Sequence, residues 1–238
     1  MKTLIAVPVY DAIKPESMTG ILANFQKDVA IAVEARSLVM DARNNLAVRA
    51  LEGGYDYILW CDADMDIPKG AVAQLIKDAE EHEFVSGIMF KRCFPTEPVI
   101  LKDLYWEKSG SGIITHGSTI YRDYPKDQLF EIAGCGFGFC IMQAKILEKI
   151  VQRFNESPFN MLPQMGEDYS FCWRLQQVGV KMWCDSRVKI GHVGTYIYRE
   201  EDWLRQEGLA QTTDEFQKGF EAGQKEGLKK AIERLTDV

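Results

Sequence analysis

The chain has 238 residues, of which 46% are hydrophobic, and its formal net charge is −7. This composition excludes a disordered chain and predicts one compact globular core. The acidic balance disfavours broad binding to a polyanion, because phosphate contacts need a basic surface, although a local basic patch stays compatible with it. Six cysteines without a CxxC pair predict reduced core thiols rather than zinc ligands or disulfides.

The N-terminus passes directly from Met1-Lys2-Thr3 into a short apolar run. That run is too short for a signal peptide, and no stretch of about 18 or more apolar residues follows. We therefore expect a soluble, cytoplasmic protein with no integral membrane segment.

The first strand is expected from Thr3 to Asp11, where a nearly all-apolar run predicts burial on both faces. A helix from about Pro15 to Gln26 and a strand from Asp28 to Glu34 would complete a βαβ unit. Ligands of open α/β sheets collect beyond the carboxyl ends of strands. Tyr10 and Asp11 are therefore candidates to stack on a base and to bind its imino group, the alternative being a tyrosine that anchors the loop.

The next helix is predicted from Leu38 to Leu51 by apolar residues at helical spacing, and Gly53-Gly54 is a typical helix end. Arg43 is one of the polar residues of this helix that fall mostly outside the apolar stripe. It could bind a diphosphate or pair with a nearby aspartate, or it could form an ordinary exposed ion pair of little energetic weight.

An apolar strand from Tyr55 to Cys61 leads into Asp62, Asp64 and Asp66, which occupy alternate positions. An extended backbone would point all three the same way, and carboxylate oxygens are the ligands that Mg²⁺ and Mn²⁺ prefer. The pattern therefore predicts a divalent metal site. The alternative is a solvated acidic turn in which Asp66 caps a helix that begins at Pro68.

The alternation continues with a helix from Pro68 to Glu80 and a strand from Glu83 to Phe90, which favours a doubly wound, mainly parallel sheet. From Lys91 to Gln128, repeated prolines and glycines predict a hairpin-rich insertion rather than a separate domain.

A glycine-rich strand is expected from Glu131 to Met142, with glycine at alternate positions from Gly134 to Gly138. One face of this strand would be bare. It would accommodate either a closely packed neighbouring strand or a flat surface for a sugar ring.

A later helix is predicted from Gly166 to Val178, with Glu167 and Asp168 in its first turn. The helix dipole favours acidic residues there, and the functional alternative is a general base or an orienter of an acceptor hydroxyl. His192 follows two short strands predicted over residues 181–184 and 188–190. It could complete a carboxylate metal site or be a hydrogen-bonded polar residue.

The chain beyond Tyr198 is rich in Glu and Lys with regularly spaced apolar residues, which predicts one or two amphipathic helices. These helices would pack on the core, join a partner subunit in a homo-oligomer or touch a membrane, and their mixed charges favour the first two. We expect residues 1–198 to form the main domain and residues 199–238 a C-terminal helical extension.

Together, Ala42-Arg43-Asn44 and the run from Gly54 to Asp64 closely resemble the helix and DxD strand of GT-A glycosyltransferases, especially family-2-like enzymes. The resemblance covers roughly residues 3 to 195 and extends to Pro8-Val9-Tyr10, the glycine-rich strand, Gly166-Glu167-Asp168 and His192. It implies the α/β GT-A fold of nucleotide-diphospho-sugar transferases. It also implies transfer of a sugar from a UDP- or GDP-sugar to an acceptor that the sequence does not identify, with Mn²⁺ or Mg²⁺.

The same resemblance implies a role for each matching residue. Asp168, with Glu167 beside it, corresponds to the catalytic base of inverting members, although retaining members also carry an acidic pair there. The implied nucleotide contacts are Pro8, Tyr10, Asp11, Arg43 and Asp62. The implied metal ligands are Asp64 and His192, with Asp62 close by and Asp66 as an extra carboxylate of open role.

One departure from the family pattern concerns recognition of the nucleobase of the donor. Many members carry an acidic pair with Gly-Ser after the second strand, where this chain has Glu34-Ala35-Arg36-Ser37, so Glu34 is an approximate substitute.

Two other functions stay open. A nucleotidylyltransferase would usually have a Gly-rich, Arg-containing loop that Val7-Pro8-Val9-Tyr10-Asp11 lacks, and a catalytically silent carbohydrate-binding module would not need the acidic residues.

Overall fold

The computed structural model of the protein describes residues 1–35 and 38–207. Residues Met1–Glu200 form one compact unit. In chain order the elements are β1 (Thr3–Val9), α1 (Pro15–Ala23), β2 (Val29–Ala35), α2 (Val39–Glu52), β3 (Tyr57–Cys61), β4 (Met65–Asp66), α3 (Ala71–Asp78), β5 (Phe84–Ile88), β6 (Ile100–Lys108), β7 (Ile114–Ile120), β8 (Leu129–Ile132), β9 (Gly134–Cys135), β10 (Phe139–Gln143), α4 (Lys145–Phe154), α5 (Glu167–Gln177), β11 (Met182–Lys189), β12 (Gly191–Val193), β13 (Ile197–Tyr198) and α6 (Glu200–Gln206).

Seven strands form the central sheet, in the order β2-β1-β3-β10-β5-β11-β8. β1 pairs in parallel with β2 and β3, and β11 pairs in parallel with β5. β10 runs antiparallel between β3 and β5, and β8 runs antiparallel to β11. Only β10 and β8 are reversed within this sheet, which confirms the predicted mainly parallel arrangement.

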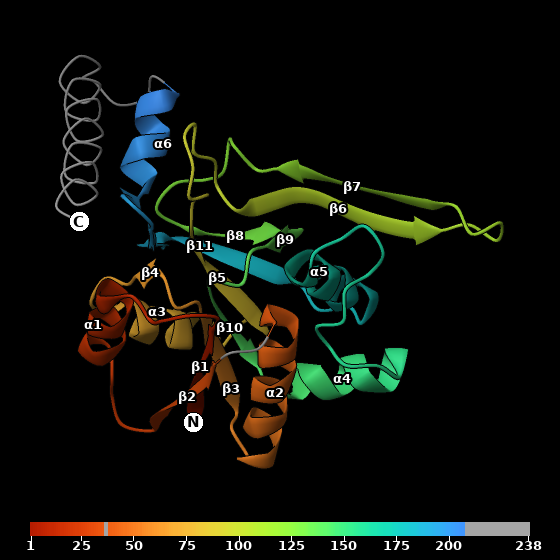
Figure 1. Cartoon of the computed structure of the whole chain (residues 1–238), viewed down its shortest axis with the longest axis horizontal. Coiled ribbons are helices and arrows are strands. Elements are labelled where there is room, and N and C mark those ends of the chain that lie inside the picture. Colours follow the sequence, from red (N-terminus) through yellow and green to blue (C-terminus); the bar gives the residue numbers. More distant parts are fainter. Residues whose placement is uncertain (36–37, 208–238) are drawn as a thin grey trace, which may run out of the picture. The chain divides into compact units, whose positions relative to one another are not determined.

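Helices cover both faces of this sheet, as predicted for a doubly wound fold (Figure 1). α1 and α3 lie on one side of the strands, and α2, α4 and α5 lie on the other. Ile21 of α1 and Leu75 of α3 belong to one buried cluster with Ile5 and Leu59 of the sheet. On the opposite face α2 packs on β1, β2 and β3, and its Leu46 is fully buried.

The glycine-rich stretch is not the single strand that the sequence predicts. The chain forms β8, β9 and β10 there and breaks between them. A Cβ added at Gly136 would lie 2.9 Å from Val99 Cγ1, and one added at Gly138 would lie 2.9 Å from Met89 Sδ. The glycines therefore allow close packing by side chains of neighbouring segments, which supports the packing alternative over a bare surface for a sugar ring.

β6 and β7 form a long antiparallel hairpin, which confirms the hairpin-rich insertion (Figure 1). The hairpin is attached to the loop before α5, where the Trp106 indole N–H donates to the carbonyl of Pro163 at 3.1 Å. The ring centres of Trp106 and of Trp173 in α5 lie 5.4 Å apart, with one ring edge-on to the other. These contacts fix the hairpin beside the start of α5.

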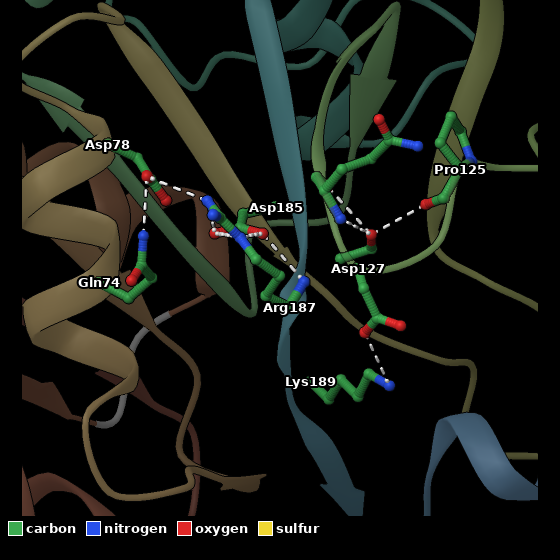
Figure 2. Close-up of polar contacts among 9 residues, drawn as sticks. Gln74, Asp78, Pro125, Asp127, Asp185, Arg187 and Lys189 are labelled. Carbon is green, nitrogen blue, oxygen red and sulfur yellow. Dashed lines mark hydrogen bonds and ion pairs between the residues drawn. The ribbon is translucent and has the colours of Figure 1, made fainter.

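A buried carboxyl pair connects α3 to β11 (Figure 2). Arg187 donates to both oxygens of Asp185, at 2.8 Å to each, and reaches Asp78 at 3.4 Å. Gln74 also donates to Asp78, at 2.9 Å. Burial and the neighbouring Asp185 raise the pKa of Asp78 above its ordinary value. The pair is therefore most stable when Asp78 keeps its proton.

Five of the six cysteines are buried, as predicted for core thiols, whereas Cys93 is exposed. Across residues 1–35 and 38–207, no helix combines the length and apolar character needed to span a membrane. The extension predicted over residues 199–238 begins with α6, and residues 208–238 lie outside the described part of the chain. The cytoplasmic location stays a prediction.

Candidate functional site

The backbone from Asp62 to Asp66 is not continuously extended, because a turn at Ala63 and Asp64 interrupts it, so the extended geometry expected from the alternate spacing is wrong. β3 ends at Cys61, and the chain turns through Asp62–Asp64 before β4 begins at Met65. The Asp62 amide donates to the Gly138 carbonyl at 2.8 Å, which fixes the turn. The aspartates are then paired with three different arginines: Asp62 with Arg43, Asp64 with Arg92 and Asp66 with Arg199.

The alternative in which Asp66 caps the following helix is also wrong. That helix, α3, begins at Ala71 rather than Pro68, and its N-cap residue is Gly70. The Asn24 side-chain oxygen, from the end of α1, accepts the Gly70 amide at 2.8 Å. Asp66 instead accepts a hydrogen bond from Arg199 at 2.5 Å. Its carboxylate is therefore paired with Arg199 and does not cap α3.

Arg43 lies at the centre of a buried charge cluster. It projects from α2, and its side chain is only 1% exposed. The Arg43 Nη2 lies 3.1 Å from Asp62 Oδ1 and 3.3 Å from Asp168 Oδ1, and its Nε lies 3.8 Å from Glu167 Oε1. Its Nη1 donates to the Phe137 carbonyl at 3.3 Å. One guanidinium thus connects the acidic turn after β3 to the first turn of α5.

Aromatic rings surround this guanidinium. Its central carbon lies 5.4 Å from the ring centre of Phe137, 5.9 Å from that of Phe159 and 6.0 Å from that of Trp60. Burial alone would lower the pKa of Arg43, but the three carboxylates raise it above its ordinary value. The cation is therefore permanent, and it is held by its partners and by the ring faces.

The carboxylates outnumber the cation at their centre. Burial raises the pKa of Asp62 to about 6, against the opposing effect of Arg43 and with the support of Asp168 and Asp64. Burial and the adjacent Asp168 likewise raise the pKa of Glu167. Three acidic groups around a single arginine create a site whose electrostatics favour a proton or an additional cation.

Asp168 is oriented from two directions and stays accessible. Its Oδ2 accepts the Phe137 amide at 3.3 Å, and its Oδ1 lies beside Arg43. Its side chain is 28% exposed. The predicted helix start is confirmed, because α5 begins at Glu167 after Gly166 as its N-cap. The geometry therefore presents one ordered carboxylate to solvent at a helix N-terminus.

Asp64 and His192 come together, as their implied shared role requires. The His192 Nε2 lies 3.3 Å from Asp64 Oδ2, and its Nδ1 lies 3.0 Å from the Phe90 carbonyl. Because a carbonyl only accepts, Nδ1 must carry the hydrogen, and Nε2 is the nitrogen directed at the carboxylate. Burial alone would lower the pKa of His192, but the hydrogen bond that it donates to the Asp64 carboxylate, together with the negative charge of that group, raises the pKa overall.

The proximity of Asp64 and His192 follows from strand pairing. β12 runs antiparallel to β4, with His192 opposite Met65. The Val193 amide also donates to the Asp64 carbonyl at 2.7 Å. This short three-stranded sheet, β13-β12-β4, is what connects residues so distant in the sequence.

A cation fits the donor chemistry of this pair, which combines a carboxylate oxygen with an imidazole nitrogen whose other nitrogen is fixed by a carbonyl. Within the described residues, no three His, Cys, Asp or Glu side chains gather closely enough to form a complete ligand set. The binding of a metal by Asp62 or Asp66 stays a prediction. Arg92, which pairs with Asp64, was not identified from the sequence, because nothing in its local pattern marks it.

Three of the five residues implied to contact the nucleotide, Pro8, Tyr10 and Asp11, lie at the end of β1. Pro8 is buried opposite Glu34 of β2, whereas Tyr10 and Asp11 are exposed, Tyr10 to 82%. The Lys14 amide donates to the Ala63 carbonyl at 2.8 Å, which attaches this loop to the acidic turn. Their contact with a base stays a prediction.

Two further residues have partners within the protein. Glu34 accepts hydrogen bonds from Arg49 at 2.6 Å and from Asn45 at 3.1 Å. The buried Arg43 faces carboxylates of its own chain, so direct contact with a diphosphate would require these groups to separate. Its implied role as a nucleotide ligand stays a prediction, while the pairing with an aspartate that its position suggested is confirmed.

Comparison with known protein structures supports the general fold of the chain. No protein-family model matches the sequence, and no curated protein matches it. The crystal structure of A197 from STIV resembles the chain with a TM-score of 0.56 and 16% sequence identity, over 82% of this chain and 86% of that chain. The crystal structure of GalNAc-T7 with UDP, GalNAc and Mn²⁺ gives a TM-score of 0.52 and 10% identity, over 85% of this chain and 45% of that chain. These likenesses support the general fold expected from the resemblance to GT-A glycosyltransferases.

Proposed function

We propose that the protein is a metal-dependent glycosyltransferase that moves a sugar from a nucleotide-diphosphate donor, a UDP- or GDP-sugar, to an acceptor hydroxyl. The observation that carries this proposal is the meeting of two acidic segments around Arg43. Asp62 lies 3.1 Å and Asp168 3.3 Å from the same guanidinium nitrogen. The fold shared with a structure that contains UDP, GalNAc and Mn²⁺ adds support.

Asp64 and His192 would hold the divalent cation. When bound, such a cation neutralises the charge that develops on a departing diphosphate. His192 Nε2 is aimed by the bond from its Nδ1 to the Phe90 carbonyl, so the imidazole needs no reorientation to act as a ligand. Tyr10 and Asp11, exposed beyond β1, would contact the base at the same edge of the sheet.

Asp168 would accept the proton of the acceptor hydroxyl as that oxygen attacks the sugar carbon. Its carboxylate is ordered by the Phe137 amide and by Arg43, and it is accessible enough to meet a substrate. Positioned general bases of this kind contribute about 10²- to 10⁴-fold to rate. Glu167, whose raised pKa favours its protonated form, would leave the acceptor proton to Asp168.

The proposal is tested by measuring turnover of UDP-sugars and GDP-sugars with Mn²⁺, with EDTA and in two variants. Chelation and Asp64→Asn should each abolish turnover. Asp168→Asn should slow transfer by about 10²-fold or more while leaving the Kd for the donor nearly unchanged. Asp123→Asn, on an aspartate that is 77% exposed and pairs with Lys102, is the matched control.

Two results would contradict the proposal. Turnover that survives EDTA and Asp64→Asn would refute the metal role, and normal transfer by Asp168→Asn would remove that residue as the base. Failure to bind any nucleotide diphosphate, with the fold intact by circular dichroism, would instead favour a catalytically silent carbohydrate-binding module.

A further inference from the structure

Asp64 has two neighbours, Arg92 and His192, that contact the same carboxylate oxygen. Arg92 Nη1 lies 2.6 Å from Asp64 Oδ2, and His192 Nε2 lies 3.3 Å from that same atom. The oxygen that a metal would share with His192 is therefore the oxygen that Arg92 holds. A guanidinium and a divalent cation repel each other when they compete for one oxygen.

The position of Arg92 is determined by a glycine on the opposite segment. A Cβ added at Gly194 would lie 2.8 Å from Arg92 Cδ and 2.9 Å from Arg92 Cγ. The aliphatic part of Arg92 thus lies directly on the Gly194 backbone, two residues beyond His192. Gly194 lacks the left-handed backbone angle that would by itself require glycine. Its small size is therefore what lets Arg92 reach Asp64.

We propose that Arg92 is a built-in competitor of the divalent cation, so that metal binding at Asp64 and His192 requires the guanidinium to leave. This inference rests on the proposed function, because it concerns the same metal site. Arg92 is 49% exposed, so its head group can move into solvent without unfolding the surrounding structure. The contact lowers the intrinsic affinity of the site for metal, and any anionic ligand that attracts Arg92 away from Asp64 restores it.

The test is a titration with Mn²⁺ alone, without nucleotide, followed by calorimetry and by the EPR signal of free Mn²⁺. Arg92→Gln should bind Mn²⁺ about three- to tenfold more tightly than the wild type, which is the range expected for losing an exposed ion pair and a nearby like charge. Gly194→Ala keeps the charge of Arg92 but displaces its side chain, and it should tighten binding in the same direction.

Two further variants make the result specific. Arg153→Gln removes the same charge from an exposed position on α4 and should leave the Kd for Mn²⁺ unchanged. Asp64→Asn should abolish binding, which assigns the measured signal to this site. If Arg92 were only structural, Arg92→Gln would weaken metal binding or leave it unchanged and would not strengthen it.

The outcomes separate the two proposals. Wild-type binding that is lost in Asp64→Asn but is unchanged or weaker in Arg92→Gln overturns the competition and leaves the proposed function in place. Absence of Mn²⁺ binding in the wild type and in Arg92→Gln overturns both the competition and the metal site. Tighter binding by Arg92→Gln together with unchanged binding by Gly194→Ala overturns the role of Gly194 in seating Arg92.

Discussion

Replacing Arg43 with methionine should destabilise the protein in a pH-dependent way. The substitution keeps an unbranched apolar side chain among the rings of Trp60, Phe137 and Phe159 but removes the only cation facing three carboxylates within 3.8 Å among the described contacts. Breaking a buried ion pair on one side costs about 3–5 kcal/mol, because the remaining charge is left without compensation. Since Asp62 and Asp168 are partly exposed, we expect a loss near 3 kcal/mol at about pH 8.

The sign of the pH dependence follows from the pKa values. The pKa of Asp62 is raised to about 6 in the folded protein, above its ordinary value, and that of Glu167 is raised as well. Each group therefore contributes most to stability at low pH and loses that contribution as pH rises from its unfolded to its folded pKa. Without Arg43 the folded pKa values rise further. The difference between wild type and Arg43→Met should thus be about 1 kcal/mol near pH 5 and grow towards pH 8.

The assay is urea-induced unfolding at both pH values, with thermal unfolding as a second measure. A loss of about 3 kcal/mol corresponds to a decrease in Tm of roughly 10 °C for a domain of this size. Arg49→Met is the matched control, because Arg49 lies on the same helix and pairs with Glu34 but is 52% exposed. It should cost less than about 1 kcal/mol. An equal loss from Arg43→Met at both pH values would show that Arg43 contributes only packing and would refute the electrostatic reasoning.

Three further changes test the fold around the site. Asp78→Asn should stabilise the protein at about pH 8 by about 1 kcal/mol and have little effect near pH 5, because it replaces a group whose folded pKa is raised by burial and by Asp185. Equal effects at both pH values would contradict the raised pKa of Asp78. Asn24→Ala should lower the free energy of unfolding in urea by about 1–3 kcal/mol, because Asn24 accepts the Gly70 amide and donates to the Gly20 and Pro68 carbonyls. A near-neutral result would show that water replaces these hydrogen bonds. Gly20→Ala should lower the free energy of unfolding by about 1–3 kcal/mol, because the added Cβ would lie 2.8 Å from Ile67 Cβ and 3.0 Å from the Ile67 carbonyl oxygen. Gly110→Ala is the control and should be neutral, because no atom lies within 4 Å of its added Cβ.

Local periodicity was enough to predict the alternating strands and helices of the first half. β1 and β3 are continuous apolar runs, and α2 carries a regular apolar stripe that ends at Gly53, so each segment specifies its own structure. The segment from Glu131 to Met142 is different. Its apolar residues allow one long strand, but Val99 and Met89 pack closely against Gly136 and Gly138 where the chain breaks, and those residues lie elsewhere in the sequence.

The site was predictable by residue type and less so by geometry. The acidic side chains at the ends of β3 and at the start of α5 were recognisable, because charged groups after apolar strands are conspicuous. The alternate spacing of Asp62, Asp64 and Asp66 suggested a single direction, but that inference required an extended backbone. A turn at Ala63 and Asp64 interrupts the extended backbone, and each carboxylate pairs with a different arginine from a distant segment.

The reversed strand β10 explains why the two acidic segments meet. It is inserted between β3 and β5, so the loop that precedes it returns to the carboxyl end of β3. There the Gly138 carbonyl binds the Asp62 amide, and the Phe137 amide binds Asp168, which places this loop between the two carboxylates. Arg43 binds the Phe137 carbonyl as well as both acids, so one backbone segment and one guanidinium align them. The same turn after β3 carries Asp64, whose carboxylate contacts Arg92 and His192, so the proposed metal pair lies on the segment that also positions Asp62.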